Sequence, residues 1–124
     1  MDKYFFDTYA LIEINKGNPN YKKYTGIEFV TTLFNLMEFY YALLKLIDRD
    51  LAKLKFQRYL NKCVEINSEI IMRATEFRHE FNKNNKIKIS YVDAVGYATS
   101  KKLNIKFLTG DQAFKNLNNV EYIK

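Results

Sequence analysis

The chain has 124 residues, of which 48% are hydrophobic and 27% are charged, and this balance predicts a single globular domain over residues 1–124. Lys and Arg outnumber Asp and Glu by 20 to 14, so the net charge is +6, which fits either a polyanionic partner or an ordinary solvated surface. The single cysteine excludes an internal disulfide and a multi-cysteine zinc site, and the single histidine excludes His-pair metal motifs. If the protein is an enzyme, its chemistry is therefore expected to rest on carboxylates and a metal ion.

The sequence predicts a cytoplasmic protein without a membrane span. The first apolar stretch is short and is interrupted by Asp7, which does not fit a secretory signal. The most apolar run, residues 29–44, is too short to cross a bilayer and contains Glu38.

The first half of the chain predicts two strands and three helices. Residues 4–6 are an apolar run that stops at Asp7, and a helix is expected over residues 8–15, ending at Gly17. A β-branched and aromatic run predicts a strand over residues 27–31. Apolar side chains then recur at helical spacing over residues 33–47 on nearly all sides, so that helix is expected to be buried. An amphipathic helix follows over residues 50–62.

The second half predicts further strands and helices in alternation. A candidate third strand covers residues 63–66, and Ser68 and Ser90 are expected to cap the next two helices, the second running to residue 103. Strands are expected over residues 105–108 and 120–123, with a turn and a short helix after Asp111 between them. Short apolar strands that alternate with helices predict an α/β fold with a mainly parallel sheet. In such sheets, sites form beyond the carboxyl ends of the strands, where Asp7 and Asp111 are expected.

Four acidic residues, Asp7, Glu38, Asp93 and Asp111, are each the only charge in a long uncharged stretch. An ionised carboxylate in apolar surroundings is costly unless it is paired or bound to a metal. With no local basic partner, these four acids indicate one shared partner, a divalent cation.

A structural role is the alternative for three of these acids. Asp7 and Asp111 each stand where a helix cap is needed, and Asp93 follows Ser90 by three residues, as in a capping box. Glu38 lies in the middle of a helix, where no cap is required.

Around these acids the sequence resembles the PIN-domain ribonucleases. Four segments, in order along nearly the whole chain, look like that family's four acidic motifs: Phe6-Asp7-Thr8, Leu36-Met37-Glu38-Phe39-Tyr40, Asp93-Ala94-Val95 with Ala98-Thr99, and Leu108-Thr109-Gly110-Asp111. The resemblance implies a three-layer α/β/α fold around a sheet of about five strands in the order 3-2-1-4-5. It also implies that the four acids gather at the carboxyl end of that sheet.

The resemblance further implies a metal-dependent endoribonuclease, with Mg²⁺ or Mn²⁺ held by Asp7, Glu38, Asp93 and Asp111. Small members of the family are often toxins of VapBC-type toxin–antitoxin pairs, so RNA as substrate, a homodimer and a small antitoxin are the expected partners. Thr8 and Thr109 are candidates to orient carboxylates or water, or are plain helix caps.

Candidates for RNA contact are Lys45, Arg49 and Lys53, which are predicted to line one helix at intervals of four residues. A solvated face explains the same spacing. Two further alternatives remain at this point: a non-catalytic RNA- or protein-binding module on the same fold, and a PIN nuclease that processes RNA without an antitoxin.

Overall fold

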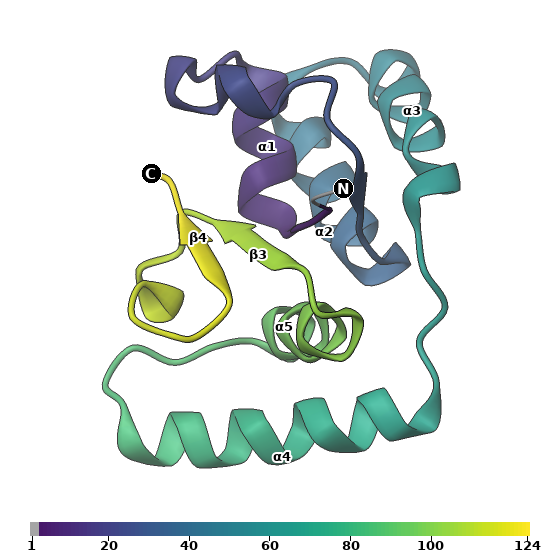
Figure 1. Ribbon diagram of the computed structural model, residues 1–124. Coiled ribbons are helices and arrows are strands. Elements are labelled where there is room, and N and C mark those ends of the chain that lie inside the picture. The colour runs from purple at the N-terminus through teal and green to yellow at the C-terminus, as the bar shows by residue number, and fades with distance from the viewer. Residues whose placement is uncertain (1–2) are drawn as a thin grey trace.

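A computed structural model describes residues 3–124 as a four-stranded parallel sheet with helices on both faces (Figure 1). No helix in the described part of the chain is long and apolar enough to cross a bilayer. The elements in chain order are β1 (Tyr4–Phe6), α1 (Thr8–Lys16), β2 (Phe29–Val30), α2 (Leu33–Leu46), α3 (Arg49–Arg58), α4 (Ser68–Asn84), α5 (Tyr91–Leu103), β3 (Lys106–Thr109) and β4 (Val120–Tyr122). Short 3₁₀ helices cover Pro19–Tyr24, Leu60–Lys62 and Gln112–Phe114.

The strand order β2-β1-β3-β4 confirms the predicted three-layer α/β/α architecture. The expected strand over residues 63–66 is reduced to one bridge, in which Cys63 pairs with Thr31 beside β2. The observed order agrees with the predicted order 3-2-1-4-5 if the bridge at Cys63 is counted as the third of five strands. Pairing stops there because the chain leaves the sheet at Thr32, whose side chain caps α2, so residues after Val64 have no strand beside them.

Alternate residues of the central strands build two cores, one on each face of the sheet. In the paired strands β1 and β3, Phe5 and Phe107 face one side, and Phe6 and Leu108 face the other. The first side packs against α5, which α4 covers from outside, and the second packs against α1 and α2 (Figure 1). Gly96 allows α5 to approach closely, because a Cβ there would lie 2.9 Å from the ring of Phe5. This packing places α5, the helix that carries Asp93, directly against β1 and β3.

Two helix boundaries differ from the sequence prediction. The helix expected over residues 50–62 begins at Arg49, because Asp48 accepts a hydrogen bond from the Leu51 N–H, and it ends at Arg58 before a 3₁₀ turn. Helix α4 is capped by Asn67 instead of Ser68, since the Asn67 side chain accepts from the Ile70 N–H. Asp48 lies two residues before the predicted start of its helix at residue 50, and Asn67 lies one residue before the predicted cap Ser68.

The prediction that α2 is buried on all sides is wrong. Leu36, Phe39 and Leu43 are buried in the core, but Met37 and Tyr41 are 58% and 63% exposed. The sequence periodicity identified the helix correctly, yet one chain supplies neighbours for only one side of it. The other side is an apolar surface without a partner among residues 3–124.

Candidate active site

Asp7 lies at the carboxyl end of β1 and is 2% exposed. One of its carboxylate oxygens accepts a hydrogen bond of 3.0 Å from the Ala10 N–H, which caps α1. The other oxygen accepts a bond of 2.5 Å from the hydroxyl of Thr109, at the end of β3. Asp7 is therefore a helix cap, as the structural alternative predicted, and is also tied to the neighbouring strand.

Glu38 belongs to a chain of side-chain hydrogen bonds that joins α1 to α2. The Thr8 hydroxyl donates to the Glu38 carboxylate at 2.7 Å, and the Asn35 amide donates to the same Thr8 oxygen at 3.2 Å. The Thr32 hydroxyl in turn donates to the Asn35 carbonyl at 2.6 Å. Thr8 therefore does hold a carboxylate.

Asn35 is a residue that the sequence analysis missed. It is 1% exposed, and it lies one helical turn before Glu38 within an otherwise apolar run. A buried amide in such a run needs hydrogen-bond partners, and this was the signal that could have identified it.

Asp93 and Asp111 are half-buried and are held by backbone groups near them in sequence. Asp93 accepts from the Ser90 N–H at 3.0 Å while Ser90 caps α5, which completes the predicted capping box. Asp111 accepts from the Ala113 N–H at 3.0 Å and caps the 3₁₀ helix that follows. Both structural alternatives are therefore present, and neither excludes a further role for these carboxylates.

Gly110 forms the tight turn between Thr109 and Asp111. A Cβ at this position would lie 2.2 Å from a ring atom of Tyr9 and 2.6 Å from the Ile123 carbonyl oxygen, so only glycine fits. The turn brings the Asp111 N–H within 3.0 Å of the Thr109 hydroxyl, which itself donates to Asp7. Thr109 thus links the Asp7 carboxylate to the backbone of Asp111.

Electrostatic repulsion connects the four acids through Asp93, which interacts with Asp7, Glu38 and Asp111. Burial, together with the charges of Asp93 and Asp111, raises the pKa of Asp7 from 3.8 to about 8, against the lowering effect of its hydrogen bonds. Burial also raises the pKa of Asp93, with added repulsion from Asp111 and Glu38. These are the effects expected when carboxylates converge in a site of low dielectric.

The donor set suits a hard divalent cation. All four side chains offer carboxylate oxygens, which Mg²⁺ and Mn²⁺ prefer. Within residues 3–124, no group of three or more His, Cys, Asp or Glu side chains is arranged so that it could hold a metal ion. The second carboxylate oxygens of Glu38, Asp93 and Asp111 accept no hydrogen bond from another described residue. These oxygens remain available to an added cation.

The predicted RNA-contact row does not lie on one helix. Lys45 lies in the last turn of α2, whereas Arg49 and Lys53 belong to α3, because the backbone of Ile47 is extended and Asp48 starts a new helix. Lys45 is seven residues after Glu38, about 10 Å further along α2, and its ammonium lies 4.2 Å from the ring centroid of Tyr41. The structure therefore divides this row between two helices.

Comparison with known proteins identifies the family. The profile of the PIN domain matches residues 4–120 of this chain. The chain belongs to the PIN domain family. No curated protein matches it significantly in sequence.

Solved structures share the fold of this PIN domain at low sequence identity. A toxin-antitoxin complex from Klebsiella pneumoniae is 19% identical, with a TM-score of 0.74 and 95% of each chain covered. VapBC2 from Rickettsia felis, bound to a promoter DNA fragment, is 18% identical, with a TM-score of 0.72, and the match covers 98% of this chain and 99% of the other. VapC20 from Mycobacterium tuberculosis, described as a Sarcin-Ricin loop cleaving toxin, is 17% identical, with a TM-score of 0.75 and the same coverage.

Proposed function

We propose that this PIN domain is a metal-dependent endoribonuclease and the toxin of a VapBC-type pair, acting in the cytoplasm. The observation that carries the proposal is that Asp7, Glu38, Asp93 and Asp111 stand in a PIN fold, where burial, with added repulsion among these acids, raises the pKa values of Asp7 and Asp93. Fold similarity to toxin–antitoxin proteins over nearly the whole chain supports the choice within the family.

The four carboxylates would hold one or two Mg²⁺ or Mn²⁺ ions. A bound ion supplies a water of lowered pKa and offsets the negative charge of the phosphodiester. Thr109 and the Ala10 N–H fix both oxygens of Asp7, and Thr8, itself held by Asn35, fixes one oxygen of Glu38. Orientation by such surrounding donors sets the affinity and the geometry of a metal site.

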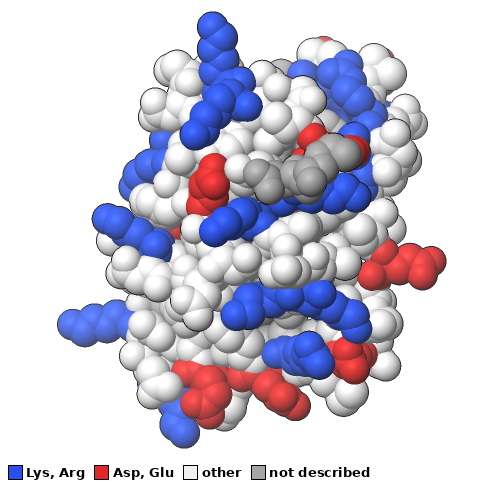
Figure 2. Space-filling view, in the orientation of Figure 1, with Lys and Arg blue, Asp and Glu red and all other residues white. Residues whose placement is uncertain are grey.

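The basic surface supports a polyanionic substrate. Within residues 3–124, three ion pairs form, and all are at the surface: Lys16 with Glu13, and Arg73 and Lys102 with Glu69. Figure 2 shows Lys and Arg side chains spread over much of one face, with Asp and Glu in small separate groups. Most basic side chains are thus free to meet the phosphates of RNA, in a salt-dependent manner.

The exposed apolar side of α2 supports protein partners, namely a homodimer and a small antitoxin. Leu33, Met37 and Tyr41 follow each other at intervals of four residues and are each more than half exposed. Apolar side chains that line up on one helix in this way are typical of an interface. Three of the structural neighbours come from toxin–antitoxin complexes, which favours an antitoxin among the partners.

The direct test is cleavage of single-stranded and structured RNA by the purified protein in Mg²⁺ or Mn²⁺, with EDTA as the metal-free control. We expect cleavage by the wild type and its loss in Asp7→Asn. Glu28→Gln, which changes an exposed acid outside the site, is expected to leave the rate unchanged. A wild type that binds RNA without cleaving it in either metal would support the non-catalytic binding module instead.

The toxin assignment needs a test of its own. Expression of the chain alone is expected to arrest bacterial growth, and expression of Asp7→Asn is not. RNA cleavage in vitro without growth arrest would favour a PIN nuclease that works in RNA processing without an antitoxin.

A further inference from the structure

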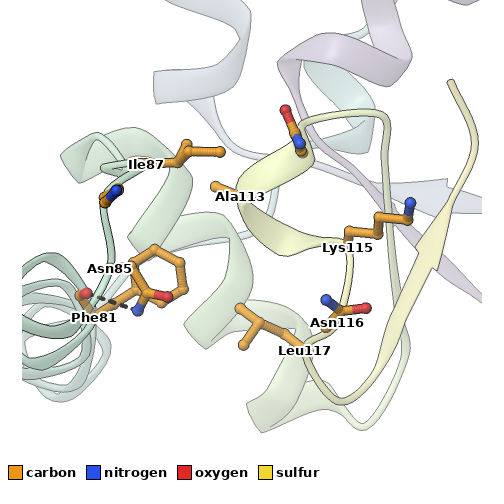
Figure 3. A pocket seen from close by; sticks show the side chains of 9 residues that line it. Phe81, Asn85, Ile87, Ala113, Lys115, Asn116 and Leu117 are labelled. Carbon is orange, nitrogen blue, oxygen red and sulfur yellow. Dashed lines mark hydrogen bonds between the residues drawn. The ribbon is translucent and has the colours of Figure 1, made fainter.

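A cavity of about 520 Å³ opens between the end of α4 and the segment that follows Asp111 (Figure 3). Each of its two walls is followed or preceded along the chain by a candidate active-site acid, Asp93 or Asp111. Gln112, in one wall, directly follows Asp111, and Ile87, in the other, lies three residues before Ser90, which caps the helix of Asp93. The cavity is therefore a neighbour of the acidic site, and neither the family motifs nor the proposed mechanism uses it.

The inner lining of the cavity is apolar. In Figure 3, Ile87 extends toward Ala113 across the gap between the two segments, and Leu117 extends toward Phe81. Ile87 is 46% exposed, although a side chain of this size and kind is usually buried. A flat apolar ligand would cover these four side chains and remove them from water.

The rim of the cavity is made of side-chain amides and lysines. Asn85, Gln112 and Asn116 place three primary amides at the opening, all on exposed residues. A primary amide offers both a donor and an acceptor, the combination that pairs with the polar edge of a nucleobase. Lys86 and Lys115 are part of the lining, and none of the lining residues is acidic. This charge balance favours a ligand that carries a phosphate.

Hydrogen bonds fix the wall formed by the loop before α5. The Asn82 side chain accepts from the Ile89 N–H at 2.9 Å and donates to the Ile89 carbonyl at 3.1 Å, which closes the loop across its base. The Lys88 ammonium donates to the Asn85 carbonyl at 2.7 Å and also to that of Asn82. A wall held in this way presents Lys86 and Ile87 in a fixed place, which reduces the entropic cost of binding a ligand.

We propose that this cavity holds a base of the RNA substrate beside the cleaved phosphodiester and so determines the sequence preference of cleavage. The inference rests on the proposed ribonuclease function. The base would stack on the apolar lining, its polar edge would meet the amides of the rim, and Lys86 would face the backbone phosphate. The volume lies within the range of about 300–1,000 Å³ that small-molecule sites occupy.

The test is the binding of fluorescein-labelled single-stranded RNA oligonucleotides in EDTA, measured by fluorescence anisotropy. The variant Asn85→Ala with Gln112→Ala removes two rim amides and is expected to bind about tenfold more weakly than the wild type. Asn84→Ala is the matched control, because Asn84 ends the same helix and bonds the Glu80 carbonyl as Asn85 bonds that of Phe81, but it is not part of the cavity. We expect Asn84→Ala to bind like the wild type.

An abasic scan of the oligonucleotide locates the effect. At one position of the RNA, removal of the base is expected to weaken binding to the wild type. On that abasic RNA the wild type and the double variant are then expected to have the same affinity. The proposal of a base pocket would be overturned if the wild type and the double variant bound the intact RNA equally well. It would also be overturned if the wild type lost the same affinity on every abasic RNA.

The two proposals can fail separately. RNA cleavage by the wild type together with unchanged RNA binding by the double variant would leave the nuclease and overturn the pocket, in favour of a protein side chain as its occupant. The expected binding pattern without cleavage in Mg²⁺ or Mn²⁺ would support the pocket and contradict the nuclease.

Discussion

The two halves of the acidic site hold their carboxylates by different means. Asp7 and Glu38 depend on hydroxyl donors from other elements, since Thr109 is 102 residues from Asp7 and Thr8 is 30 residues from Glu38. Asp93 and Asp111 accept from backbone N–H groups two or three residues away. The first pair therefore depends on contacts made by the tertiary fold, in addition to the cap that Asp7 forms on α1, whereas the second is positioned by local capping alone.

This difference implies that the two pairs respond differently to substitution. Loss of a distant hydroxyl frees an oxygen of Asp7 or Glu38 without altering a helix end. Loss of a cap partner weakens a helix end but leaves the carboxylate near its place, because the backbone N–H remains. The predictions below test this contrast, beginning with the largest expected effect.

The largest effect is expected for Thr109→Val, which removes the hydrogen bond to the Asp7 carboxylate while keeping the shape of the side chain. RNA cleavage, measured as kcat/KM, should fall by about 10–100-fold, the usual cost of losing a donor that orients a metal ligand. Thr99→Val is the matched control, since Thr99 is also buried but its hydroxyl bonds only the Val95 carbonyl of its own helix. Equal losses in the two variants would mean that Thr109 has a purely structural role.

Asn35→Ala is expected to lower both stability and activity, since it removes the amide that joins Thr32 to Thr8. The buried hydroxyls left without this partner should cost about 1–3 kcal/mol of folding free energy, measured by urea unfolding. The Glu38 carboxylate also loses its support, so cleavage should fall in parallel. A variant as stable and as active as the wild type would show that the hydrogen-bond chain does not position Glu38.

Asp7→Asn is expected to stabilise the metal-free protein, and more so at high pH. The pKa of folded Asp7 lies near 8, above its ordinary value of 3.8, so the folded state binds the proton more tightly. Stability due to this group is full below pH 3.8 and is lost as the pH rises to about 8. Asparagine carries no charge, so the Tm of Asp7→Asn in EDTA should exceed that of the wild type by about 4 °C or more at pH 8, and by less at pH 5.

The control for this prediction is Asp48→Asn, which changes an exposed acid that caps α3 in the same way that Asp7 caps α1. It should show no gain in Tm with rising pH. A pH-independent or negative effect of Asp7→Asn would mean that the Asp7 carboxylate is not destabilised in the folded protein.

The smallest effect on activity is expected for Ser90→Ala. It removes the side-chain half of the capping box, which should cost about 1 kcal/mol of stability, or a fall in Tm of about 4 °C. The Ser90 N–H still donates to Asp93, so cleavage should change by less than about threefold, well below the loss in Thr109→Val. A loss of activity as large as that of Thr109→Val would remove the distinction between the two halves of the site.

Local signals in the sequence predicted much of the fold. The apolar runs of β1 and β3, the caps at Ser90 and Asp111, and the alternation of strands with helices all depend on near neighbours in the chain. The strand expected at residues 63–66 failed because its existence depends on the length of β2, which ends where Thr32 starts to cap α2. Neither the sequence of β2 nor that of residues 63–66 alone determines whether the two segments pair.

Acids that stand alone in apolar stretches could be singled out from the sequence, whereas side chains whose position depends on distant contacts could not. Isolation singled out four acids whose charges interact in the fold, yet it gave no sign that Asn35 supports Thr8. The row from Lys45 to Lys53 failed because spacing by four residues means a shared face only within one unbroken helix. The exposed side of α2 was missed because apolar periodicity does not distinguish burial in a core from burial against another chain.

The central claim is that Asp7, Glu38, Asp93 and Asp111 together hold a divalent cation, and titration of the purified protein with Mn²⁺ by isothermal calorimetry tests it most directly. The wild type should bind Mn²⁺, and Asp7→Asn, Glu38→Gln, Asp93→Asn and Asp111→Asn should each weaken binding by about tenfold or more, while Glu28→Gln does not. A wild type that binds no Mn²⁺, or four variants that bind it as well as the wild type does, would contradict the account.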